Sequence, residues 1–353
     1  MSGGIINYLI QEDFRLSTMR NTIIKFIVVA FIFLLPLITF AIEPNVKVFM
    51  YHRFNQFKYP ETNISSKVFE EQMKYLINHN YKILPLTELI SFLKKNKKIP
   101  KKSIFITIDD AFKSFYDHGF PILKKLKIPF SIFVSTDFVS NHKKSDFMSW
   151  KMLKEISENN GLILNHTKNH QSLLNMNEEK IKQNILKNQN LIENKLGSIP
   201  KILSYPFGES NIKIEEIVKK LNYEIAFSQH SSIVTKNENL FRLPRFALNE
   251  EFGSLERFKS IVKYKPLIVY DYSFNDAELH TDNFILSFKS NILSNNINCF
   301  INNNANLIKK DDGNFNLLEI SNLKLGLRYR INCTHIDNKG EIFWLGRMFK
   351  RVI

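Results

Sequence analysis

The sequence lacks the short motifs that mark several common functions. Cysteine occurs only at Cys299 and Cys333 in 353 residues, which excludes a zinc knuckle. A glycine-rich phosphate loop and an RNA-binding aromatic signature are also missing. Acidic residues number 34 against 49 lysines and arginines, a formal charge of +15. The lysines are dispersed among asparagines and isoleucines and form no basic stripe, so we expect no nucleic-acid partner.

The amino terminus has an apolar run that is too short for a comfortable membrane span, Phe26 to Ile38. A basic start precedes this run, and Pro36 interrupts it. Thr39 and Ala41 then occupy the minus-three and minus-one places of a cleavage point. We interpret residues 1–41 as a signal peptide or upstream extension and predict export to the periplasm or cell envelope. An uncleaved signal anchor that associates with the membrane is the alternative.

The two cysteines are 34 residues apart in strand-like surroundings near the end of the chain. An even pair in an exported protein predicts a disulfide. Two buried free thiols are the alternative.

From Val46 onward, short strands alternate with amphipathic helices. About seven such repeats predict an α/β fold, a distorted (β/α)7-type barrel over residues 45–265. Beyond Pro266, short strands and turns without helices predict a small antiparallel β-sandwich over residues 266–353.

Polar side chains stand where the predicted barrel strands end. Asp109 and Asp110 end the run "SIFITID", and His166 and His170 follow "GLILN". Two histidines four residues apart and one carboxylate can hold a metal ion with open positions for water and substrate. The alternative for the aspartates is that Asp110 caps a helix near Ala111 and Asp109 is solvated. Four further residues stand at or near strand ends: His52, Phe207, His230 and Arg245.

These segments resemble the polysaccharide deacetylase (NodB-homology) family, carbohydrate esterase family 4. "TIDDA" is similar to its Thr-Phe-Asp-Asp-Gly motif, "NHTKNHQSL" to its His-Thr-x-x-His motif, and "SYPFG" to its Arg-x-Pro-Tyr/Phe motif. The opening "VFMYHRF" and the late "LPRFALNE" look most like the exported branch that includes deacetylases of biofilm poly-N-acetylglucosamine. Two departures from the motifs are Ala111, in place of glycine, and Ser204, in place of arginine.

The resemblance implies a role for each residue at these strand ends. It makes Asp109 the general base and Asp110, His166 and His170 the ligands of a divalent metal, Zn²⁺ first, with Ni²⁺, Co²⁺ or Fe²⁺ as alternatives. The first choice of general acid is His52, and the second choice is His230. The backbone N–H of Phe207 is expected to hold the oxyanion.

Tyr205, Phe207 and Arg245 are expected to bind substrate. Tyr205 and Phe207 could equally pack the barrel top. Arg245 could also supply the charge that the arginine replaced by Ser204 would bring to the base.

The implied function is metal-dependent removal of N-acetyl groups from an envelope or extracellular polysaccharide. An O-acetyl xylan-type esterase and a catalytically silent glycan-binding protein are the alternatives. The attacking water and the oxyanion are alike for amides and esters, so the sequence does not separate the first two.

Overall fold

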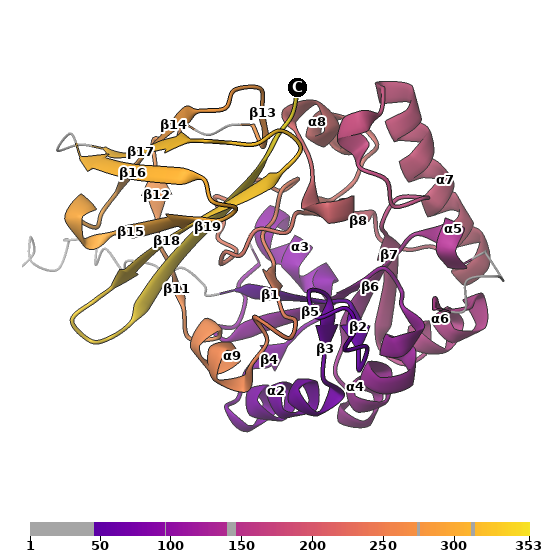
Figure 1. The fold of residues 1–353 in the computed structure, drawn as a ribbon. Helices are drawn as coiled ribbons and strands as arrows, with labels where there is room; N and C mark the ends of the chain where they lie inside the picture. Colours follow the sequence, from indigo (N-terminus) through magenta and orange to yellow (C-terminus); the bar gives the residue numbers. More distant parts are fainter. Residues whose placement is uncertain (1–45, 96, 140–145, 274–275, 312–314) are drawn as a thin grey trace, which may run out of the picture. The chain divides into compact units, whose positions relative to one another are not determined.

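A computed structural model describes residues 46–95, 97–139, 146–273, 276–311 and 315–353, which belong to one compact unit (Figure 1). The predicted signal segment lies outside these residues. Among the residues described, no helix is long and apolar enough to cross a membrane.

The first two-thirds of the described chain form a parallel eight-stranded sheet. Its strands follow the order β10-β1-β5-β6-β7-β8-β9, and β4 also pairs with β5. Their bounds are β1 Lys47–Tyr51, β4 Lys82–Ile83, β5 Ser103–Asp109, β6 Phe130–Val134, β7 Gly161–Asn165, β8 Ile202–Ser204, β9 Ile225–Phe227 and β10 Phe246–Ala247. This half-barrel confirms the predicted α/β fold class.

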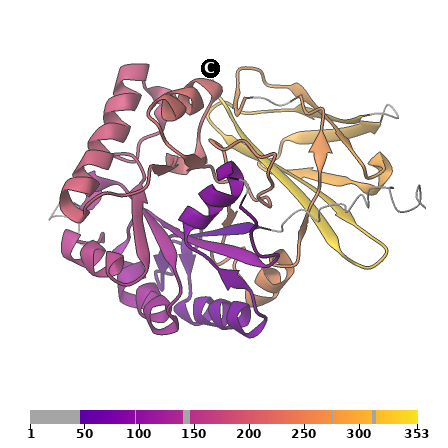
Figure 2. The same ribbon diagram turned by 180° about the vertical axis from the view of Figure 1, so that it is seen from behind.

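Helices connect and cover these strands (Figures 1 and 2). They are α2 Ser66–Asn78, α3 Leu86–Lys95, α4 Phe120–Leu126, α5 Thr136–Val139, α6 Trp150–Ser157, α7 Glu178–Leu196, α8 Ile212–Lys220 and α9 Leu255–Ile261. A π-helical turn, η1 (Phe115–Gly119), precedes α4, and single 3-10 turns cover η2 (Leu173–Asn175) and η3 (Pro206–Gly208). The small strands β2 (Arg53–Phe54) and β3 (Asn63–Ile64) pair with each other.

Strand β5 shows why the sheet forms and where its cores lie. All seven of its residues are buried. Ile104, Ile106 and Ile108 join one hydrophobic cluster, whereas Phe105 joins another. Since successive side chains of a strand point to opposite faces, the sheet is covered on both. The carboxyl end of β5, with Asp109, is therefore fixed by packing on two sides.

The chain from Lys265 onward forms two further sheets. One has β15 (Asn298–Ile301), β18 (Arg328–Ile336) and β19 (Ile342–Arg351), with β11 (Lys265–Pro266) and β13 (Glu278–Leu279) along β19. The other has β12 (Val269–Tyr270), β14 (Phe284–Ser290), β17 (Asn316–Ser321) and β16 (Asn306–Asp311). The 3-10 turn η4 (Ser294–Asn296) precedes β15.

These two sheets share a core through alternate residues of their strands. Leu318 and Ile320 of β17 are buried with Tyr329 and Ile331 of β18 in one cluster. The predicted sandwich differs from the structure in two details. Both β11 and β13 run parallel to β19, so the first sheet is mixed. Strand β16 was not predicted, because its lysines and the following "KDDGN" resemble a turn. The domain boundary at residue 266 stays a prediction.

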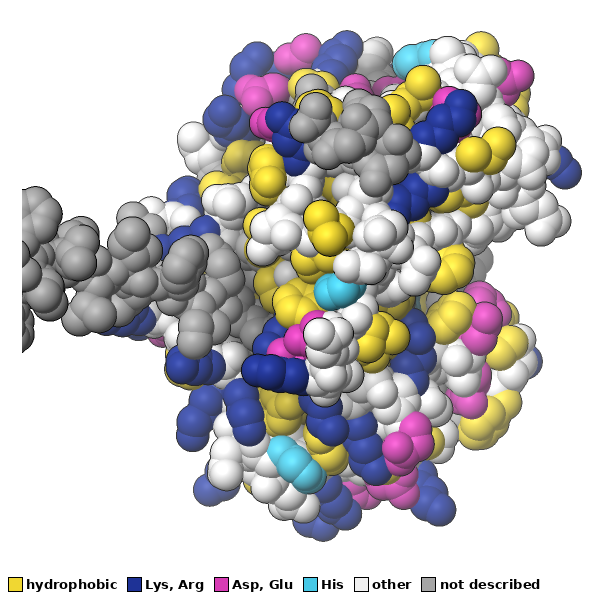
Figure 3. Space-filling view, turned by 90° about the vertical axis from the view of Figure 1, so that its left-hand side faces the viewer, with side chains coloured by type: hydrophobic (Ala, Val, Ile, Leu, Met, Phe, Trp, Pro, Cys, Tyr) yellow, Lys and Arg dark blue, Asp and Glu magenta, His cyan; other side chains and the backbone are white. Residues whose placement is uncertain are grey.

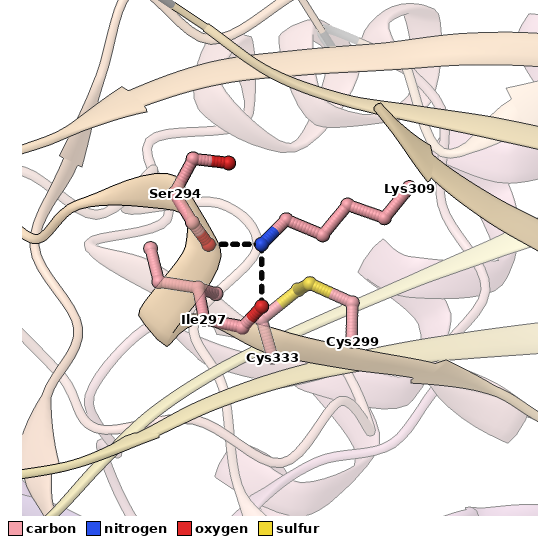
Figure 4. The surroundings of a disulfide bond; sticks show 5 residues. All are labelled: Ser294, Ile297, Cys299, Lys309 and Cys333. Atoms are coloured by element: carbon pink, nitrogen blue, oxygen red, sulfur yellow. Dashed lines mark hydrogen bonds between the residues drawn. A yellow bond between two sulfur atoms is a disulfide. The ribbon is translucent and has the colours of Figure 1, made fainter. Parts of the chain in front are cut away.

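Cys299 and Cys333 form a disulfide between directly paired residues of β15 and β18 (Figure 4). This confirms the predicted pairing over the free-thiol alternative. The ammonium of Lys309 donates to the carbonyls of Ser294 and Ile297 beside the bond. On the face of the molecule that Figure 3 shows, Lys and Arg side chains are interspersed with hydrophobic and acidic ones.

Candidate active site

Asp109 and Asp110 reach one site because the backbone turns where β5 ends. Asp109 is the last residue of the strand, and Asp110 and Ala111 adopt left-handed conformations with φ of 72° and 55°. This turn changes the direction of the second carboxylate, which an extended strand would point to the opposite face. Helical residues begin at Lys113 and continue into the π-helical turn at Phe115, so Asp110 is not their cap. Ala111 stands at a positive φ that glycine, the family residue, adopts at less cost.

His166 follows β7 and is completely buried. Its Nδ1 donates to the carbonyl of Ser204 at 2.7 Å, which leaves Nε2 as the free ring nitrogen. Nε2 lies 3.3 Å from Oδ1 of Asp110. Both atoms are buried without a hydrogen-bond partner, although buried polar atoms are normally paired. The pair is therefore arranged to bind a third group.

His170 completes this cluster, with Nε2 at 3.1 Å from the same oxygen of Asp110. The three ligand atoms lie within 4.8 Å of one another. Ligand atoms around a tetrahedral zinc ion would be roughly 3.3 Å apart. Burial raises the pKa of Asp110, but the imidazoles of His166 and His170 beside the carboxylate outweigh burial and hold the pKa well below its usual value. The donor set and its spacing fit a divalent metal ion.

Asp109 does not take part in this cluster but is held by Arg245, which precedes β10. Nη1 and Nη2 of Arg245 donate to Oδ1 and Oδ2 of Asp109, each at 2.7 Å, and both side chains are fully buried. Burial raises the pKa of Asp109, but the charges of Arg245 and His166 outweigh burial and keep the pKa below its usual value. Asp109 thus stays ionised beside the cluster of Asp110, His166 and His170.

Ser204 links Arg245 to Asp109, from the place where the family motif has arginine. Nη2 of Arg245 donates to Oγ of Ser204 at 2.8 Å, and that oxygen lies 3.3 Å from Asp109. Arg245 also donates to Thr107 Oγ1 and to the Ser228 carbonyl. Arg245 has no exposed surface and its guanidinium is engaged with these partners, which argues against the predicted contact with substrate. The guanidinium lies where it supports Asp109.

His52 follows β1 and is partly buried at the same site. Burial lowers the pKa of its imidazole, and Arg245 and His166 lower it further, against the attraction of Asp110 and Asp109. Two neighbouring carboxylates favour the charged imidazole, but burial outweighs them, and the direction is the opposite of the one that suits a general acid. The role of His52 as general acid stays a prediction.

Tyr205 and Phe207 flank Pro206 but differ in exposure. Tyr205 is fully buried in a hydrophobic cluster, which favours the alternative that it packs the barrel top over the prediction that it binds substrate. Phe207 is 37% exposed, and its ring lies edge-on to His170 at 4.8 Å. Its φ of 60° is left-handed, and the next residue, Gly208, packs so closely on Gln229 that a Cβ would lie 2.4 Å from the backbone nitrogen. Phe207 is therefore presented to solvent beside His170.

His230 lies at a different cavity of about 260 Å³, with Arg242, Glu238 and Arg347 among its lining. Burial lowers the pKa of His230 well below its usual value, and the charges of Arg347 and Arg242 act in the same direction. This placement removes the basis for predicting His230 as the general acid.

A row of aromatic rings beside His170 was not predicted from the sequence. The ring of Phe138 lies 6.2 Å from His170 and stacks on Phe147 at 4.6 Å. Phe147 stacks in turn on Phe112 at 5.0 Å. These rings come from separate segments without a shared spacing, so only the folded chain shows that they are neighbours.

Comparison with known proteins identifies the family. A polysaccharide deacetylase family model matches residues 96–226. The poly-beta-1,6-N-acetyl-D-glucosamine N-deacetylase of Staphylococcus aureus (strain MSSA476) is 32% identical over 201 residues, which cover 54% of this chain and 69% of that protein. This chain belongs to the polysaccharide deacetylase family. The resemblance inferred from the three motifs is thereby confirmed.

Solved structures of polysaccharide deacetylases share the fold. The Streptococcus pyogenes deacetylase PplD in complex with acetate matches with a TM-score of 0.58 and 22% identity, covering 62% of this chain and 99% of that one. IcaB from Ammonifex degensii matches with a TM-score of 0.57 and 22% identity, covering 62% and 97%. At this identity the likeness supports the deacetylase fold alone.

Proposed function

We propose that this chain is a metal-dependent hydrolase that removes N-acetyl groups from a poly-N-acetylglucosamine-type polysaccharide. The observation that carries the proposal is the ligand cluster of Asp110, His166 and His170 next to an ionised carboxylate, Asp109, held by Arg245. A carboxylate that is kept charged beside a metal site is suited to act as a base.

Asp110, His166 and His170 would hold the ion, with Zn²⁺ as the first expectation. A divalent ion at this site acidifies a water and polarises the acetamide carbonyl. The hydrogen bond from Nδ1 of His166 to Ser204 keeps Nε2 available for the ion. Asp110 remains ionised and offers its unpartnered Oδ1.

The remaining residues move protons and orient groups. Asp109 accepts a proton from the attacking water, and Arg245 fixes the direction of the accepting oxygens. His52 donates a proton to the amine as it leaves, because an amine leaves poorly unless it is protonated. The backbone N–H of Phe207 donates to the oxygen on which negative charge develops.

The choice of substrate rests on the Staphylococcus aureus relative, whose name gives poly-beta-1,6-N-acetyl-D-glucosamine as its substrate. Export to the periplasm or cell envelope is part of the proposal, and the Cys299–Cys333 disulfide supports it because disulfides persist in oxidising compartments.

Acetate release from poly-N-acetylglucosamine, chitin oligomers, peptidoglycan and acetylated xylan, measured on metal-loaded protein, tests the proposal. We expect release from the first substrate to be fastest. A folded protein with about one ion per chain that releases no acetate from any glycan would instead be a binding protein. Preference for acetylated xylan would make it an esterase.

Two variants separate the proposed roles. His170→Ala should lose metal and activity together, because it removes a ligand. Asp109→Asn should keep the metal and lose about 10²- to 10⁴-fold in kcat, the usual effect of removing a general base. His118→Ala, at an exposed histidine outside the cluster, is the matched control and should change neither property. Loss of metal in Asp109→Asn would mean that the two aspartates have exchanged roles.

A further inference from the structure

A groove of about 690 Å³ is lined at one side by His170 of the ligand cluster and continues onto the C-terminal sheets. The barrel contributes His170, Asn175, Phe207 and Glu209 to its lining, and the C-terminal strands β18 and β19 contribute Arg328 and Lys350. Arg328 and Lys350 are directly paired residues of the two strands and lie outside the matched family region, 96–226.

Glu209 joins the two parts of the groove. Its carboxylate is almost fully buried. It accepts hydrogen bonds from Nζ of Lys350 at 2.9 Å and from the hydroxyl of Ser172, and Nε of Arg328 lies 3.7 Å away. Buried carboxylates are stable when they are paired in this way. The barrel therefore fixes the position of both cations of the C-terminal sheet.

Arg328 also contacts Phe207, the exposed aromatic residue beside His170. Nη1 of Arg328 donates to the carbonyl of Phe207 at 3.0 Å, and the guanidinium lies 5.5 Å from the centre of the ring. A cation over an aromatic face stabilises the arrangement. The Arg328 side chain remains 34% exposed, so it presents both charge and hydrogen-bond donors to the groove.

The charges of the groove favour the binding of N-acetylglucosamine over that of glucosamine, its deacetylated form. Lys350 balances the charge of Glu209, and the more exposed Arg328 adds one positive charge that no other groove carboxylate balances. N-acetylglucosamine is neutral and carries amide and hydroxyl groups that a guanidinium can bind. Glucosamine carries an ammonium, which a neighbouring guanidinium repels.

We propose that Phe207, Arg328 and Lys350 form a subsite for the sugar beside the one being deacetylated, and that this subsite selects an N-acetylated sugar against glucosamine. The inference rests on the proposed function and adds the C-terminal sheets to the substrate site. It follows that the enzyme deacetylates sugars whose neighbour in this subsite still carries its acetyl group, so that free amines are spaced along the polymer.

The test uses fully acetylated β-1,6-linked pentamers and pentamers with a single free amine at each position in turn. For wild type, we expect one position of the amine to lower kcat/KM for release of the neighbouring acetyl group. Arg328→Gln should raise KM for the acetylated pentamer roughly 3- to 10-fold, as expected for loss of one hydrogen bond at a partly exposed site, and should reduce the discrimination. Arg328→Lys retains the charge and should retain the discrimination. An activated aryl acetate, which does not reach the subsite, should be hydrolysed equally by all three proteins.

Lys339→Gln is the matched control, because it removes the same charge from an exposed residue in the turn at the other end of the β18–β19 hairpin. Thermal unfolding shows whether each variant is folded. The inference is overturned if folded Arg328→Gln discriminates as wild type does, or if its hydrolysis of the aryl acetate falls as much as that of the pentamer. Failure of wild type to release acetate from any pentamer would overturn the proposed function itself.

Discussion

Replacement of Arg245 by methionine tests whether Asp109 depends on a charge brought from another strand. The two residues are 136 positions apart in the sequence, are both fully buried, and share two hydrogen bonds of 2.7 Å. Removing one partner of a buried ion pair leaves an uncompensated charge and costs about 3–5 kcal/mol. Arg245→Met should lower the free energy of unfolding by this amount at pH 7, measured with urea on metal-free protein.

The pH dependence of this loss identifies its cause. In wild type, the pKa of Asp109 is below its usual value, so its contribution to stability is present above the unfolded pKa and is lost as pH falls through the folded pKa. Without Arg245, burial raises that pKa, so protonation on acidification relieves the buried charge. The difference in stability between wild type and Arg245→Met should therefore shrink as pH falls.

An arginine at position 204 should restore the ion pair with Asp109 in a variant that lacks Arg245. Oγ of Ser204 lies 2.8 Å from Arg245 and 3.3 Å from Asp109, so an arginine there can reach the vacated position. Arg245→Met should also reduce kcat about 10²-fold on metal-loaded protein, because a base displaced by about 1 Å typically loses that much. The double variant Ser204→Arg/Arg245→Ser should recover most of both losses. Arg257→Met, at a partly exposed residue of α9, is the control. A loss below about 1 kcal/mol in Arg245→Met, or a double variant no better than the single one, would refute the reasoning.

Four further predictions follow from the same contacts. His52→Ala should retain the metal while kcat for the amide falls more than kcat for an aryl ester, whose leaving group needs no proton; equal losses in a kinetic assay would contradict the acid role. Burial lowers the pKa of His230, so the unfolded chain binds a proton more readily and stability falls as pH drops through about 6.5, by up to about 1.4 kcal/mol per pH unit. His230→Gln should make that decline shallower in urea titrations at pH 5 to 7, and an unchanged slope would exclude His230 as the cause. Replacing Cys299 and Cys333 by serine should cost about 4 kcal/mol by the loop-entropy model, read from urea unfolding, and an unchanged midpoint would show that the bond does not constrain the unfolded chain. Ala111→Gly should be nearly neutral in the same assay, because relief of a positive φ, about 1 kcal/mol, offsets loss of a buried methyl, about 0.8 kcal/mol; a large change in either direction would mean that one of these terms is misjudged.

The sequence predicted the part of the site that is formed by residues at or just after the ends of strands. Asp109, Asp110 and His166 stand at the ends of strands whose hydrophobic pattern is clear, and the ends of parallel strands meet at one edge of a sheet. His170 could be placed with them because it is four residues from His166.

The sequence did not predict contacts set by packing between distant segments. Nothing near Arg245 indicates that its guanidinium is buried against Asp109 rather than exposed to substrate. Tyr205 and Phe207 flank the same proline, yet only the fold decides that one is buried and the other exposed. Arg328 and Lys350 occupy ordinary positions of an alternating hairpin, and Glu209 brings them to the groove.

The positive φ angles around the ligand cluster have a consequence for local opening of the chain. Asp110, Ala111, Thr167, His170 and Phe207 all adopt left-handed conformations, on three separate loops. Each costs a residue other than glycine roughly 1–2 kcal/mol, so several kcal/mol of strain is concentrated in these loops. In the metal-free protein, these loops should therefore open before the buried strands that support them, and their amides should exchange hydrogen fastest. A bound ion stabilises only the closed arrangement, so saturation with metal should slow exchange in all three loops together.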